Sequence, residues 1–226
     1  MNRVGACVLV VLAGVLGAQP AAAQDVSRYR DYVLASSLES VVALSGARAA
    51  DVKTVHQRPA TIHELEWRAP YMRSDRVQPD PVRDIAFTFY NDALYQIVVT
   101  YDPDRTDGLT AKDVVDSLTA TYGPPVAGPA KSRPSSSLSE RVVELARWES
   151  DASSVTLLRD VHSPEFRLML ISKALSARAG TAIREATRLD LLEAPRREQE
   201  RRSKDAADAT AAREKTRTTN KEAFRP

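Results

Sequence analysis

Cysteine is nearly absent from this chain of 226 residues, which contains a single one, Cys7, in an apolar stretch near its start. Residues 24–226 contain none, which excludes disulfides, thiolate metal sites and a cysteine nucleophile from that part of the chain. A lipidated cysteine should follow the apolar stretch, whereas most of the stretch follows Cys7. We therefore expect no lipid anchor.

Long hydrophobic runs are equally scarce. The only one covers residues 4–16, just after Arg3, and it is shorter than the roughly 20 apolar residues that span a bilayer. Gln19-Pro20 and the alanines at 21–23 follow it, which is the order of a secretory signal with its cleavage site. We predict that residues 1–23 are a signal peptide, that no transmembrane segment remains after cleavage, and that the protein is periplasmic or secreted.

A dominant charge of one sign is also missing, because 32 Lys and Arg face 30 Asp and Glu, for a net charge of +2. This balance indicates no nucleic-acid partner. Residues 193–226 carry ten basic against seven acidic residues, an excess of +3. We predict a charged tail that is solvated helix or disordered. The alternative is adhesion to an anionic envelope surface or an acidic partner.

Signature motifs of catalysis are absent: there is no Gly-x-Ser-x-Gly elbow, phosphate-cradling glycine loop or dinucleotide fingerprint. The histidines, His56, His63 and His162, have no metal-ligand spacing. His63 alternates with Leu65 and Trp67, which predicts a partly buried position in a sheet. We therefore assign no catalytic residue, no cofactor-binding residue, no cofactor and no metal ligand, and expect no enzyme activity.

The segment from Asp102 to Asp113 is the one place where a metal remains an alternative. Its alternating acidic residues and its glycine are similar to a calcium loop. However, Gly108 falls one place late, and Asp113 is shorter than the usual bidentate glutamate. A turn before a capped helix accounts for the same residues on local grounds.

Two stretches resemble each other and organise the rest of the chain. Each begins with a helix, the first capped by Ser36 or Ser37 and ending at Gly46, the second capped by Thr110 and ending before Pro124. Each helix precedes a strand that ends in tryptophan, at residues 62–67 and 142–148. A one-residue bulge in the second strand would align the two. We expect Trp67 and Trp148 in the core rather than stacked on sugar or peptide.

A hairpin pattern follows each tryptophan strand, at 85–89 and 95–101 with a turn at Asn91-Asp92, and at 154–158 and 166–171. The predicted fold class is α+β, with two tandem αβββ repeats, 24–108 and 109–174. They form one antiparallel sheet of about six strands with helices on one face. A docking helix at 175–192 completes a repeat domain at 24–192, and Pro195 should kink or interrupt the helix before the tail at 193–226.

The segment Tyr122-Gly123-Pro124, followed by a tryptophan strand and a hairpin, resembles bacterial exported proteins of uncharacterised function. More distantly, the chain is similar to the tandem-repeat beta-lactamase-inhibitor-like fold and to outer-membrane assembly proteins of SmpA/OmlA type. The resemblance covers about residues 30–175 and implies a binding module with no catalytic residues to transfer. Those assembly proteins carry a lipidated cysteine that this chain lacks.

The favoured function is therefore a non-catalytic periplasmic or secreted binding or scaffolding protein, with a protein or cell-envelope component as partner. It would use the exposed face of the sheet and the basic tail. The alternative is an envelope hydrolase that uses carboxylates, such as Glu64 and Glu66, or His63.

Overall fold

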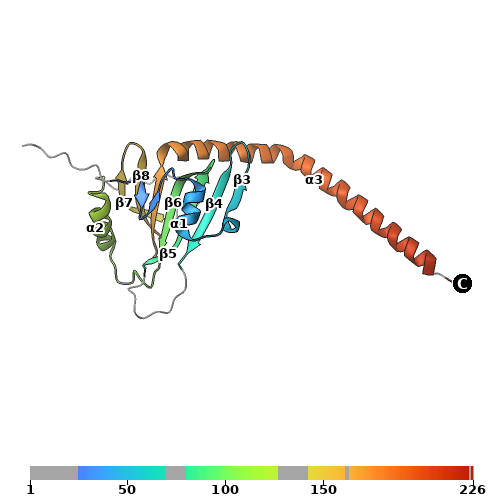
Figure 1. Ribbon diagram of the computed structural model, residues 1–226, viewed down its shortest axis with the longest axis horizontal. Coiled ribbons are helices and arrows are strands. Elements are labelled where there is room, and N and C mark those ends of the chain that lie inside the picture. Colours follow the sequence, from blue (N-terminus) through green and yellow to red (C-terminus); the bar gives the residue numbers. More distant parts are fainter. Residues whose placement is uncertain (1–24, 70–79, 127–141, 161–162, 224, 226) are drawn as a thin grey trace, which may run out of the picture.

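The computed structural model describes residues 25–69, 80–126, 142–160, 163–223 and 225. The predicted signal peptide at 1–23 and His162 lie outside these residues. The described chain is α+β, as predicted, and its main element is an antiparallel sheet of seven strands in the order β3-β4-β5-β6-β9-β8-β7 (Figure 1). In chain order the strands are β3 (Lys53–His56), β4 (Ile62–Arg68), β5 (Val82–Tyr90), β6 (Ala93–Tyr101), β7 (Val142–Glu149), β8 (Ser153–Asp160) and β9 (Phe166–Ser172).

Three helices and a small hairpin accompany the sheet. The helices are α1 (Leu38–Ser45), α2 (Ala111–Tyr122) and α3 (Lys173–Ala223), and the hairpin pairs β1 (Arg28–Tyr29) with β2 (Tyr32–Val33). A short 3-10 helix, Ala49–Asp51, lies between α1 and β3. The sequence predicted about six strands in the sheet. The seventh is β3, a four-residue edge strand whose first three residues are exposed.

Local sequence fixes where the two short helices begin. The Ser37 side chain accepts a hydrogen bond from the amide of Ser40, and Gly46 ends α1 in the left-handed region at φ 68°. Thr110 caps α2 and exchanges hydrogen bonds with Asp113 in a capping box, which satisfies amides that the first helical turn leaves unpaired. Both caps confirm the predicted starts.

Two predicted irregularities of the sheet are also present. Asn91 and Asp92 join β5 to β6 with φ of 44° and 66°, the left-handed conformation that a two-residue hairpin turn needs. The pairing of β7 with β8 shifts register between Glu144 and Ala146. This is the bulge expected in the second tryptophan strand.

The first face of the sheet holds the main core. One row of residues crosses six strands in register, and each of them is at most 1% exposed: Leu65, Phe87, Ile97, Leu170, Val155 and Trp148. Val41 of α1 and Tyr122 of α2 belong to the same cluster. Each large apolar side chain buried there contributes about 1.5–3 kcal/mol. Trp67 packs partly buried against this cluster, so both tryptophans are core residues.

Helix α3 contacts the other face of the sheet, at one end of the strands. Its Ala179 clusters with Ile62 and Tyr95, and Leu175 and Ile183 pack around them. Ile62 lies three residues from Leu65 on an uninterrupted strand, which puts the two side chains on opposite faces. Figure 1 shows α3 crossing this end of the sheet and continuing past β3 into solvent.

Pro195 was expected to kink or interrupt the helix, and it does not interrupt it, because α3 is one helix of 51 residues with Pro195 inside it. The boundary expected between residues 192 and 193 is therefore not a helix end. Proline removes one backbone hydrogen bond and tends to bend a helix, and Figure 1 shows α3 changing direction as it leaves the body. Ion pairs of Arg58 with Asp190 and Glu193 hold the helix just before this point.

Candidate functional site

The second face of the sheet is the broadest candidate surface, because α1 and α2 pack on the first face and α3 covers only one end of the second. Its strands present rows of mostly small or medium side chains in register. The central row consists of Glu66, Ala86, Val98, Met169, Thr156 and Arg147. Val98 and Met169 are half-buried. The result is a surface of mixed polarity rather than a deep cavity.

Charged residues border this face on both sides. On β7, Nε and Nη2 of Arg147 donate to the two carboxylate oxygens of Glu144, at 3.0 and 2.7 Å, and Glu149 pairs with Lys173 at 2.5 Å. On β4, Arg68 pairs with Glu66 at 2.8 Å. Because these carboxylates already have cationic partners at the surface, they form a mixed rim rather than a field of one sign.

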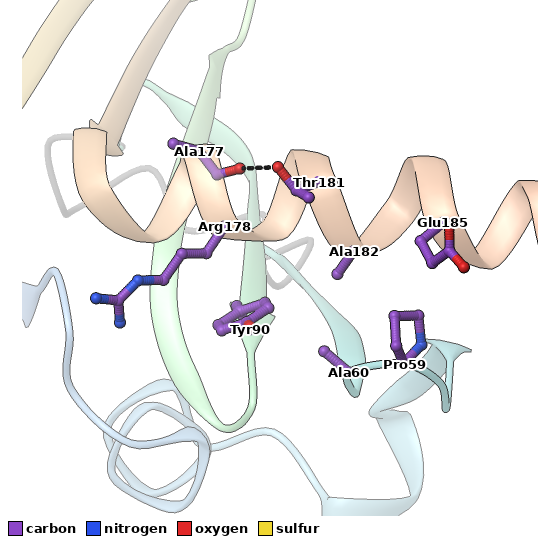
Figure 2. A pocket seen from close by; sticks show the side chains of 8 residues that line it. All are labelled: Pro59, Ala60, Tyr90, Ala177, Arg178, Thr181, Ala182 and Glu185. Carbon is purple, nitrogen blue, oxygen red and sulfur yellow. Dashed lines mark hydrogen bonds between the residues drawn. The ribbon is translucent and has the colours of Figure 1, made fainter.

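A groove under α3 is the second candidate. It has a volume of about 510 Å³, and its lining comes from three separate segments: Pro59, Ala60, Tyr90, Ala177, Arg178, Thr181, Ala182 and Glu185. Figure 2 shows the Tyr90 ring below the helix, with Arg178 and Glu185 toward opposite ends. No sequence motif could reveal this groove, since residues that lie apart along the chain meet only after α3 docks.

The hydroxyl of Thr181 is occupied, because it donates to the Ala177 carbonyl at 3.1 Å and accepts from Arg184. Glu185 accepts two hydrogen bonds from Arg188, at 2.6 and 2.8 Å, and this contact holds the pKa of Glu185 below its ordinary value. The Arg178 side chain makes no hydrogen bond or ion pair within the described part of the chain. Its exposed guanidinium is the available cation of the groove.

The distal part of α3 is the third candidate. Every residue from 201 to 223 is exposed, and this segment is roughly 35 Å long at 1.5 Å per residue. Ion pairs join neighbouring turns of this segment, such as Arg201 with Asp205 and Arg217 with Glu214. Such pairs support a helix that is polar on all sides. We call residues 201–223 the helical arm.

His63 lies on β4, next to the edge strand β3, with a side chain that is 16% exposed. Its Nδ1 is 3.1 Å from the Thr54 hydroxyl, and its Nε2 is 3.7 Å from a carboxylate oxygen of Asp92. The partly buried position matches the prediction. His63 does not line the groove under α3, and neither do the predicted carboxylates Glu64 and Glu66, which are exposed on the second face.

Local hydrogen bonds account for the acidic residues of the segment that was considered as a calcium loop. One carboxylate oxygen of Asp113 accepts hydrogen bonds from the Thr110 amide at 2.8 Å and the Thr110 hydroxyl at 2.6 Å. Asp102 accepts from the Asp104 amide at 2.9 Å. These groups build the turn and the cap of α2. In the described ranges, no three His, Cys, Asp or Glu side chains are grouped as metal ligands.

Polar contacts around the β1–β2 hairpin serve the fold. Tyr122 donates from its hydroxyl to the Arg28 carbonyl at 3.0 Å, and burial raises the pKa of Tyr101 and of Tyr29. Arg30 donates to both carboxylate oxygens of Asp80, at 2.6 and 2.7 Å, and this contact lowers the pKa of Asp80. Tyr122 therefore ties the β1–β2 hairpin to α2, and Asp80 ties it to the chain just before β5.

None of the helices in the described ranges combines the length and the apolar character that a membrane crossing requires. No known protein family matches the chain, and neither curated proteins nor solved structures yield a match.

Proposed function

We propose that this chain is a non-catalytic binding or scaffolding protein that is exported to the periplasm or secreted, and that it engages a protein or a cell-envelope component. The observation that carries the proposal is the helical arm. Residues 201–223 are exposed on every side and take no part in the core. The arm therefore adds length and charge to the molecule without adding to the stability of the body.

The second face of the sheet supports the same proposal. It offers half-buried apolar atoms between charged borders, which is the composition of a typical non-obligate interface. The proposal that the protein is exported rests on the sequence of residues 1–23 alone. The arm would extend the reach of the body toward a partner, while the sheet face would supply a flat contact area.

We further propose that the two halves are tandem repeats, each a helix and three strands. The support is the strand order, in which β4-β5-β6 and β9-β8-β7 are arranged symmetrically about the β6–β9 pair. The likeness to the beta-lactamase-inhibitor-like and SmpA/OmlA folds belongs to this proposal. Such a likeness implies recognition by a surface rather than chemistry at a pocket.

The test uses the full chain as bait in an envelope extract, beside a chain that ends at residue 200 and an Ala209→Pro variant. The proline breaks the helix of the arm but keeps its charges. We expect a specific partner that binds the full chain at defined stoichiometry. A partner lost in both variants requires a helical arm, and one lost only on truncation requires its charges. One kept by all three binds the body, and no specific partner in any of them contradicts the proposal.

An envelope hydrolase is the second candidate, favoured by the Thr54–His63 hydrogen bond, because a histidine next to a hydroxyl is the arrangement of an activated nucleophile. Hydrolysis of envelope esters or peptides by the full chain, lost in both His63→Ala and Thr54→Val, would support it. Equal turnover by the two variants and the parent would reject it.

A further inference from the structure

The groove under α3 has the size and lining of a small-ligand site. Its volume of about 510 Å³ lies within the 300–1,000 Å³ that is typical of such sites. Its floor is apolar and made largely of small residues, with Pro59, Ala60 and Ala182 beside the Tyr90 ring (Figure 2). Small residues leave room for the side chains of a ligand, and the ring supplies a large contact area.

The two charges of the groove are of opposite sign and lie on the same helix. The backbone positions of Arg178 and Glu185 are seven residues apart, which corresponds to about 10 Å along the axis of α3, and Figure 2 shows the Arg178 side chain extending away from Glu185, so the two charges lie at least that far apart. Arg178 is exposed and lacks a partner among the described residues, so it can receive a carboxylate through two parallel hydrogen bonds. Glu185 is held ionised by Arg188, and its remaining lone pairs can accept from an ammonium group.

This spacing fits a zwitterion of limited length. An extended peptide advances about 3.3–3.6 Å per residue, so the termini of a tripeptide are about 10 Å apart. A dicarboxylate would place its second negative charge beside Glu185, and a longer peptide would carry its amino terminus past that residue. The apolar floor between the charges favours an apolar middle residue.

We propose that this groove binds a short peptide of about three residues, with its free carboxylate on Arg178, its middle side chain on Tyr90 and Pro59, and its amino terminus toward Glu185. The proposal rests on the proposed binding function and names a ligand class for one surface of the protein.

The test is calorimetric titration of the full chain with the tripeptide alanyl-leucyl-alanine. We expect binding that weakens at least tenfold when the tripeptide is C-terminally amidated, or when Arg178→Gln is used. Acetylation of the amino terminus should weaken binding about threefold. Arg213→Gln removes an arginine of the same helix in the exposed arm, and it should bind the tripeptide like the parent.

Absence of binding at 10 mM, or equal binding of the free and amidated tripeptides, would overturn the proposal. A Tyr90→Ala variant removes the ring under the middle side chain and should weaken binding at least fivefold, and circular dichroism checks that each variant keeps the fold of the parent. Mass spectrometry of the recovered tripeptide separates the two proposals. Recovery of intact peptide supports a non-catalytic function. If the peptide binds and is then cleaved, the proposed peptide site stands, but the proposed non-catalytic function is contradicted.

Discussion

The indole nitrogen of Trp148 donates a hydrogen bond of 2.6 Å to the backbone oxygen of Gly123. The contact links the end of α2 to the core row of the sheet. Because the indole is 1% exposed, the carbonyl has no water to replace this donor. The tryptophan therefore fills the core and satisfies a helix end at once.

Replacing Trp148 by phenylalanine should lower the free energy of unfolding by about 2–3 kcal/mol, because it removes buried volume and leaves the Gly123 oxygen unsatisfied. Trp67→Phe is the matched control, since Trp67 is only partly buried, and it should cost roughly half as much. Urea unfolding followed by circular dichroism measures both. Equal losses would contradict a special role for the Gly123 contact.

Glu165 is a buried carboxylate between two cations. Its side chain is 7% exposed and contacts Arg83 and Arg167, each at 2.6 Å. Glu165→Gln keeps the shape but removes the charge, and should cost about 1–2 kcal/mol, since solvent partly screens both arginines. Glu66→Gln breaks an exposed pair with Arg68 and should stay within about 0.5 kcal/mol. Thermal unfolding of the two variants measures both costs. Similar losses of stability would contradict the expected difference between the buried and the exposed ion pair.

The Arg30–Asp80 pair should make stability depend on acid pH. Hydrogen bonds from Arg30 lower the pKa of Asp80 in the folded protein. The ion pair therefore contributes its full stabilisation above the pKa of Asp80 in the unfolded chain, about 3.9. This stabilisation is lost as the pH falls through the lower pKa of Asp80 in the folded protein. Asp80→Asn should cost about 0.5–1 kcal/mol at pH 6 and progressively less below pH 4. A cost that stays constant from pH 6 to 2.5 would exclude this origin.

A chain that ends at residue 200 should unfold with the free energy of the full chain, within about 0.5 kcal/mol, because residues 201–223 bury nothing. Its helical circular dichroism signal should fall by the share of the removed residues. In the full chain, 1 M salt should reduce the helical signal by screening the ion pairs of the arm. A large loss of body stability on truncation would show that the arm contacts the core.

The turn at Asn91-Asp92 offers a stabilising change. Asp92 has φ of 66°, a conformation that glycine adopts without steric cost. Asp92→Gly should raise the free energy of unfolding by about 0.5–1 kcal/mol, as measured by urea unfolding. A decrease instead would mean that the carboxylate beside His63 contributes more than the backbone strain removes.

Sequence reasoning found the elements that local chemistry specifies. The caps at Ser37 and Thr110, the turn at Asn91 and the bulge near Glu144 each follow from a few neighbouring residues. The alternation of residues 85–89 identified a strand because the pleat buries every second side chain.

Elements that depend on distant contacts were missed. The β1–β2 hairpin has two residues per strand and no alternation, and burial of Tyr29 together with the Arg30–Asp80 pair holds it in place. Strand β3 is polar and exposed, so no hydrophobic pattern marks it. Pro195 predicted a kink or an interruption on local grounds, and α3 continues through it without an interruption. The groove under α3 exists only after this helix docks.

The strand order also has a consequence for how the chain folds. Among the strands that the structure describes, all pairs within β3-β4-β5-β6 and within β7-β8-β9 join strands that are consecutive in sequence, and only β6 with β9 pairs one half with the other. Each half can therefore collapse as a local meander, and the slow step is the meeting of Val99 with Leu168 and of Ile97 with Leu170. The turn at Gly108, which has open space around its Cα, lies between the halves. Two separately made fragments, cut there, should reassemble through that strand pair and through the docking of α3 on Ile62 and Tyr95.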